Sequence, residues 1–181
     1  TTSVHVLSVR NECKELLFVV EREADGREPL VRCINFGLDG MQSFSFTLEE
    51  ERSAVLVPAG QVGTYLYEPN ASVLKAGAFK QIAVRTGVKK LQVNSHLYTA
   101  DHLVSDFPGR RFRVDEVLSF TGKLCKGLSK TIPQANITVR NFPLSVEELR
   151  KRTKITDGGH VYLFATTLVD GEKVLVKCSK A

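Results

Sequence analysis

The sequence lacks the features that mark a membrane-spanning protein or a disulfide-rich secreted one. None of its apolar runs reaches the roughly eighteen residues that a transmembrane helix requires, and no signal peptide stands at its start. The four cysteines are scattered and include no C-x-x-C pair. We therefore expect reduced thiols in a cytoplasmic protein.

Catalytic and cofactor signatures are also missing. The sequence has no G-x-S-x-G nucleophile motif, no P-loop and no glycine-rich turn from a strand into a helix. His96 and His102 lie near Asp101 and Asp106, but no histidine pairs with a cysteine at metal-site spacing. Loop histidines that bind nothing are much commoner than metal ligands. We therefore predict no catalytic residue, no metal ion and no cofactor within this chain.

The charge is distributed unevenly along the sequence. Residues 1–70 hold 6 Lys and Arg against 11 Asp and Glu, a net charge of −5, whereas residues 71–181 hold 19 against 9, a net charge of +10. With 43% hydrophobic and 25% charged residues, the composition is that of an ordinary globular chain. The basic half fits a polyanionic partner, and a solvated basic surface is the alternative that the count leaves open.

Hydrophobic patterning predicts an α+β chain with mixed sheets. The apolar runs 4–10 and 14–22 are nearly continuous, which suits a hairpin of strands buried on both faces. The longest helix is expected at 70–87, with Asn70 as its N-cap and Gly87 as its C-cap. Further strands are expected at 29–36, 43–48, 64–69, 107–120 and 135–142, a short helix at 122–132, and a hairpin about Asp170-Gly171.

The stretch N-F-P-L-S-V-E-E-L-R-K-R-T-K-I at 141–155 begins as a helix and then turns basic. Ser145 is the expected N-cap, Glu148 completes a capping box, and Leu144 can pack on Leu149 as a hydrophobic staple. Acids at the start and cations at the end suit the helix dipole. The four cations within 150–154 exceed what the dipole needs. Either they point to solvent or they hold an acidic partner.

Several stretches together resemble a bacterial family of class I S-adenosylmethionine-dependent methyltransferases. The most specific are Y-E-P-N at 67–70 and N-F-P-L-S-V-E-E-L-R at 141–150. The others are V-H-V-L-S-V-R-N-E-C-K-E-L-L-F at 4–18, N-S-H-L-Y-T-A-D-H-L-V-S-D-F-P-G-R at 94–110 and D-G-G-H-V-Y-L-F-A-T-T at 157–167. The resemblance, together with an N-terminal Thr in place of Met, implies that this chain is the C-terminal region of a longer enzyme.

The resemblance also implies a domain plan. Residues 1–60 would complete the sheet of an upstream methyltransferase domain, 61–108 would form a small ferredoxin-like piece, and 109–181 a THUMP-like domain. S-adenosylmethionine would bind upstream, outside this chain. If the upstream sheet is absent, we expect the first hairpin to pair with residues 30–48 or with another chain, because open strand edges invite pairing.

Two functions follow from these expectations. In the first, the chain positions substrate RNA for the upstream active site, since THUMP domains of RNA-modifying enzymes bind RNA. Tyr98 and Phe107 could stack on bases, although packing in the core is the commoner role. In the second, the chain is a docking or homodimerisation module of a methyltransferase with another substrate. The phosphate contacts expected under the first function are Arg110, Arg111, Lys126, Arg140, Arg150, Lys151 and Lys154.

Overall fold

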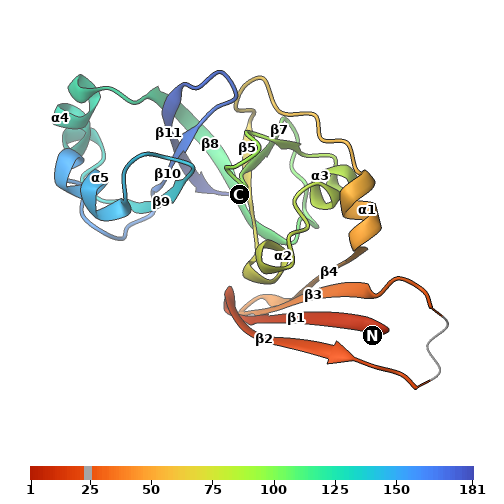
Figure 1. Cartoon of the computed structure of the whole chain (residues 1–181). Coiled ribbons are helices and arrows are strands. Elements are labelled where there is room, and N and C mark those ends of the chain that lie inside the picture. The colour runs from red at the N-terminus through yellow and green to blue at the C-terminus, as the bar shows by residue number, and fades with distance from the viewer. Residues whose placement is uncertain (23–25) are drawn as a thin grey trace. The chain divides into compact units, whose positions relative to one another are not determined.

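The computed structural model describes residues 1–22 and 26–181 and has a mixed α+β architecture with two mixed sheets (Figure 1). The charged stretch E-R-E-A-D-G-R-E-P at 21–29 predicts an acidic loop, and its residues 23–25 lie outside the described residues. The strands are β1 Ser3–Val9, β2 Glu12–Val19, β3 Leu30–Gly37, β4 Gly40–Thr47, β5 Tyr65–Pro69, β6 Lys89–Lys90, β7 Tyr98–Ala100, β8 Gly109–Ser119, β9 Asn136–Arg140, β10 Tyr162–Thr167 and β11 Lys173–Lys180. The helices are α1 Leu48–Ser53, α2 Ala71–Ala76, α3 Gln81–Thr86, α4 Gly122–Thr131 and α5 Val146–Thr153.

The chain divides into two compact units that interleave along the sequence. The first unit comprises residues 1–57, 68–88 and 104–110, and the second comprises 58–67, 89–103 and 111–181. The predicted domain boundaries at about residues 60 and 108 stay predictions. The two units are defined by contacts in space, and a domain defined by its family need not have the same boundaries. No helix among residues 1–22 and 26–181 is long and apolar enough to cross a membrane.

The first unit is built on a four-stranded sheet with the order β2-β1-β3-β4. β1 pairs antiparallel with β2 and parallel with β3, so the expected pairing of the first hairpin with residues 30–48 is confirmed. Arg10 and Asn11 form the hairpin turn, and both have a positive φ (49° and 63°), as a two-residue turn that matches the twist of the strands requires.

β2 is the open edge of this sheet. All eight of its residues are exposed, so the expectation of burial on both faces is wrong for β2 within this chain. A neighbour on each face and along the edge would be needed to bury a continuous apolar run. The described residues supply β1 along one edge and a contact with α2, and these leave all eight residues of β2 exposed. The apolar pattern of residues 14–22 is therefore that of a buried strand, whereas the described residues leave β2 exposed.

A chain of buried polar side chains joins the sheet to the Y-E-P-N segment within the first unit. The Ser8 hydroxyl donates to the Asn35 side-chain oxygen at 2.7 Å, and the Asn35 amide donates to Gln42 Oε1 at 3.4 Å. Asn70 Nδ2 also donates to Gln42 Oε1, at 3.0 Å, while Asn70 Oδ1 accepts from the backbone N–H of Val73 as the N-cap of α2. Buried polar groups of this kind are stabilising only when each finds a partner.

The expected helix at 70–87 is two helices. Asn70 and Gly87 cap the outer ends as predicted, but Gly77 adopts a left-handed conformation (φ 79°) and ends α2. Glycine takes this conformation at little steric cost, which makes it the usual residue after a helix end. The periodic apolar stripe continues across the break, and for that reason the sequence pattern did not reveal it.

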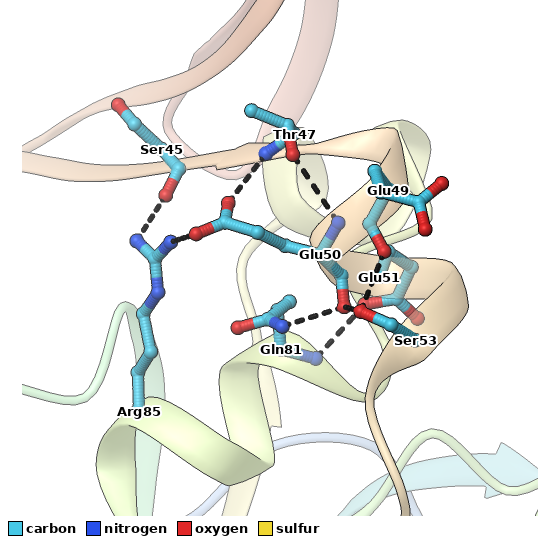
Figure 2. A network of polar contacts seen from close by, with 8 residues as sticks. All are labelled: Ser45, Thr47, Glu49, Glu50, Glu51, Ser53, Gln81 and Arg85. Carbon is cyan, nitrogen blue, oxygen red and sulfur yellow. Dashed lines mark hydrogen bonds and ion pairs between the residues drawn. The ribbon is translucent and has the colours of Figure 1, made fainter.

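The second helix, α3, is held to α1 by a polar network (Figure 2). The Glu51 carboxylate accepts the backbone N–H groups of Lys80 and Gln81 at 2.8 to 3.1 Å. Glu50 forms a capping box with Thr47 at the start of α1 and accepts a 2.8 Å bond from Arg85 of α3. These contacts satisfy helix ends that would otherwise expose unpaired backbone groups.

The second unit is built on a seven-stranded sheet with the order β6-β7-β5-β8-β11-β10-β9. β10 and β11 form the hairpin predicted at Asp170-Gly171, and β9 runs parallel to β10. α4 and α5 pack together and share one core with the sheet. The residues buried in that core are Leu128, Ile132, Ala135, Leu149, Ile155, Leu163, Ala165 and Leu175.

Candidate nucleic-acid interface

Both helices of the second unit begin at a side-chain cap. The Thr121 hydroxyl accepts the Leu124 N–H at 3.1 Å and starts α4. The predicted capping box at α5 is confirmed, since Ser145 accepts the Glu148 N–H and the Glu148 carboxylate accepts the Ser145 N–H at 2.8 Å. Capping fixes where each helix starts and hence which residues face the core.

The outward side of these helices is strongly basic. Residues 122–154 contain eight Lys and Arg and two acids, Glu147 and Glu148. We call six of the cations the helical basic face, because they are exposed and none forms an ion pair with any residue that the structure describes. These six residues are Lys123, Lys126, Lys130, Lys151, Arg152 and Lys154.

Spacing explains why the lysines of α4 share one side. Positions 123, 126 and 130 are three and four residues apart, which places their side chains above one another along the helix. The buried residues of α4 are Cys125 and Leu128. The charge of Arg152 on α5 acts on the Cys125 thiol, so Arg152 lies near α4, which α5 contacts.

Acidic residues of α5 compensate little of this charge. Glu148 is engaged in the capping box. The pKa of Glu147 is lowered, mainly by a hydrogen bond from its own backbone and one from Ser145, and in smaller part by the charges of Arg150 and Lys151. Glu147 therefore stays ionised at neutral pH, and its one negative charge leaves most of the helical basic face available to an anion.

Two of the seven predicted phosphate contacts are occupied by internal carboxylates. Arg110 belongs to the first unit and donates from Nε to the buried Glu68 carboxylate at 2.8 Å. Arg150 pairs with Asp157 and also donates to the backbone oxygens of Ile155 and Ala135. These arginines hold the chain together, and a phosphate would have to compete with their present partners.

The other five predicted contacts divide into two groups. Arg111 and Arg140 are half-buried on strands, whereas Lys126, Lys151 and Lys154 are exposed and belong to the helical basic face. The prediction for all seven stays a prediction. Lys123, Lys130 and Arg152 are exposed as well and complete the helical basic face. The sequence already places Lys123 and Lys130 on the helix expected at 122–132 and Arg152 among the cations at 150–154.

Tyr98 and Phe107 do not present their rings to solvent. The exposed fraction is 0% for Tyr98 and 2% for Phe107. The Nζ atom of Lys90 lies 5.9 Å from the centre of the Tyr98 ring, so the ring already contacts a cation within the second unit. Base stacking on either residue is therefore excluded in this conformation, and packing is their role.

His96 does not contribute positive charge at neutral pH. Burial lowers its pKa to about 4, with additional effects from the charges of Lys90 and Arg140. The ring is neutral well above that pH. The positive charge of the second unit therefore comes from its lysines and arginines, and it is constant between about pH 5 and pH 8.

Two buried cysteines do not act as nucleophiles at neutral pH. Burial raises the pKa of the Cys33 and Cys178 thiols to about 12, so neither thiol provides a thiolate at neutral pH. Within the described part of the chain, no group of three or more His, Cys, Asp and Glu side chains could hold a metal ion.

A second surface of interest is the β2 edge, which we define as Leu16, Leu17, Phe18, Val19 and Val20. These five large apolar side chains are 41 to 70% exposed. Alternate residues of a strand point to opposite faces, so apolar side chains project from both faces of the sheet next to an open row of backbone groups. Such an edge is a site for pairing with another strand.

Two family models match adjacent parts of the chain. Residues 65–108 match a ferredoxin-like domain, and residues 109–180 match a model described as THUMP domain-like. The C-terminal part of the chain is therefore a THUMP-like domain, and it contains α4, α5 and the whole helical basic face. No protein in a curated collection matches the chain.

The chain is also similar to a solved structure, the crystal structure of a "putative methyltransferase from Porphyromonas gingivalis W83". The two share 43% sequence identity with a TM-score of 0.91 over 99% of this chain. The match spans 46% of the other chain, so this chain corresponds to about half the length of that protein.

Proposed function

We propose that this chain is the substrate-recognition region of an RNA methyltransferase and that it holds RNA through the helical basic face. The observation that carries the proposal is the group of six exposed cations on two adjacent helices, which form no ion pair with the described residues. The similarity to a "putative methyltransferase" and the THUMP-like model support the reaction class and the type of partner.

The chemistry of this face suits a phosphate backbone. Lysines are flexible point charges that bind phosphate without reading the base sequence. Each phosphate that a cation neutralises releases counterions, so affinity falls with salt by roughly one logarithmic unit of slope per contact. RNA held in this way would be positioned for a methyl transfer that takes place elsewhere in a longer protein.

The turn from β5 into α2 offers little room for a nucleoside, because the side chain of Asn70 fills the helix start by accepting from Val73 N–H and Ser72 Oγ. We therefore propose that the methyl donor binds outside this chain, and we derive no step of the transfer from its residues.

We further propose that the β2 edge receives a strand from the methyltransferase portion of a longer protein. Five exposed apolar residues at an open edge favour a protein partner over solvent. The same surface supports the second function, a docking or dimerisation module, in which a second copy takes the edge. The four free cysteines support action in the reducing cytoplasm.

Fluorescence anisotropy with a labelled structured RNA at several salt concentrations tests the RNA-binding proposal. We expect the combined variant Lys126→Glu, Lys151→Glu and Lys154→Glu to bind at least about tenfold more weakly and to lower the salt slope by about two to three. A single charge reversal elsewhere, such as Lys75→Glu in α2, should change affinity less than about twofold, and Lys126→Glu alone gives the comparison at equal charge. Equal affinities of the triple variant and the wild type would refute the proposed face.

A further inference from the structure

A shallow groove runs along one side of α4. It has a volume of about 520 Å³, and its lining includes Thr121, Lys123, Leu124, Gly127, Leu128 and Thr131. These positions recur at three- and four-residue spacing, so they form one side of the helix from its N-cap to its last residue. The lining is mostly apolar, and its polar side chains are the hydroxyl groups of Ser119, Thr121 and Thr131 and the ammonium group of Lys123.

Gly127 keeps this groove open. A Cβ atom at Gly127 would meet no atom within 4 Å, and its φ is not positive. Neither packing nor backbone conformation therefore requires a glycine here, although glycine within a helix is less stable than alanine. The missing side chain leaves room for another group to approach the helix backbone.

The lysines of α4 favour an anionic partner, although the Ser119 hydroxyl in the lining donates to the Glu172 carboxylate. α4 carries Lys123, Lys126 and Lys130 and no acidic residue. The Thr121 oxygen accepts the Leu124 N–H, which leaves the hydroxyl hydrogen free to donate. A single-stranded nucleic acid offers phosphates to the cations and the flat face of a base to the apolar lining.

We infer that the α4 groove takes an unpaired base of a single-stranded RNA segment while Lys123 and Lys126 hold its flanking phosphates. This inference rests on the proposed function and adds to it a preference for single-stranded over double-stranded RNA. A duplex keeps its bases stacked inside, so it could use the helical basic face but not the groove. The chain should therefore bind single-stranded RNA more tightly than a duplex with the same number of phosphates.

Gly127→Leu tests the groove without removing a charge. Leucine favours a helix more than glycine does, so the melting temperature should stay the same or rise, and loss of folding would not explain a binding defect. We expect at least a fivefold loss of affinity for a labelled oligouridylate strand, no loss for a blunt RNA duplex, and an unchanged salt slope. Gly60→Leu, at an exposed glycine of the same unit with nothing within 4 Å, is the matched control.

The outcomes separate the two proposals. If Gly127→Leu binds both RNAs as the wild type does while the Lys126, Lys151 and Lys154 variant binds neither, the groove inference is wrong and the proposed function stands. If the wild type binds no RNA, both fail. If an oligoglutamate peptide binds and is the ligand that Gly127→Leu excludes, the groove belongs to a protein partner and the inference is overturned.

Discussion

Gly109 lies where two backbone segments of the first unit approach each other closely. A Cβ atom at this position would stand 2.1 Å from the carbonyl oxygen of Glu68 and 2.8 Å from Phe107 and from the Cα of Pro69. The backbone would have to shift to admit it. We expect Gly109→Ala to lower the free energy of unfolding by about 1 to 3 kcal/mol, measured by urea denaturation. Gly60→Ala, in open space, should change it little, and equal effects of the two would contradict the close approach.

The Glu50 carboxylate makes stability depend on acid pH. Its pKa is lowered from the ordinary value of 4.5, first by the hydrogen bond from the Thr47 backbone and then, against desolvation, by the charge of Arg85. Because the folded-state pKa is the lower one, the stabilisation is fully present above about pH 4.5 and is lost as the pH falls through the folded-state value.

Replacing the carboxylate by its neutral amide isolates this effect. Glu50→Gln keeps a side chain that can cap α1 but lacks the charge that pairs with Arg85. We expect its melting temperature to be lower than that of the wild type near pH 7 and the two to converge towards pH 3. Glu49→Gln is the control, since Glu49 is exposed and lies 3.8 Å from Arg52. A constant difference across the pH range would contradict the assignment.

At the scale of elements, α3 has a cap that its own sequence does not contain. Lys80, at its start, makes no side-chain cap, and the Glu51 carboxylate of α1 accepts the first backbone N–H groups instead. We expect Glu51→Ala to cost about 0.5 to 2 kcal/mol, the range for losing a helix cap. Chemical denaturation would measure it, with the exposed Arg52→Ala as a control, and a smaller loss than the control's would refute this role.

Elements with local signals could be predicted, and those fixed by distant contacts could not. The Ser145–Glu148 capping box and the turn of the Asp170-Gly171 hairpin each depend on residues only a few positions apart in the sequence. Both predictions are confirmed. The start of α3 depends on Glu51 of α1, which lies about thirty residues earlier in the chain and accepts the Lys80 backbone N–H across space. The parallel pairing of β1 with β3 likewise has no local pattern, although the need to pair the hairpin was foreseeable.

The candidate interface could be predicted in part for the same reason. An excess of cations at 150–154 is visible in the sequence, but the sequence does not show that Arg150 turns to Asp157 and to two backbone oxygens. The role of Arg110 depends on Glu68, forty-two residues away. Helical spacing in α4 indicates more reliably which cations are exposed than the local excess of cations does. Side chains on the outside of a short helix have few internal partners.

At the scale of the whole molecule, the surfaces of different character belong to different parts of the chain. Residues 1–70 carry a net charge of −5 and contain the exposed apolar β2 edge, whereas residues 71–181 carry +10 and contain the helical basic face. An apolar edge suits a protein partner and a basic face suits a polyanion. The two surfaces can therefore be altered separately, and each proposal can fail without the other.

The β2 edge predicts how this chain behaves when it is produced by itself. Five exposed apolar residues beside open backbone groups should drive concentration-dependent self-association. We expect Leu17→Lys with Phe18→Lys, one residue on each face of the sheet, to shift the chain to monomer in sedimentation velocity while the melting temperature stays within about two degrees, because neither side chain is buried.

Hydrogen exchange then identifies the occupant of the edge. If a methyltransferase portion supplies the missing strand, the outward backbone N–H groups of residues 12–19 should exchange much more slowly in a longer protein than in this chain, at a rate independent of concentration. If a second copy takes the edge, protection should rise with concentration in this chain as well. Fast exchange in both proteins at every concentration would mean that β2 stays solvated, and the proposed strand addition would be wrong.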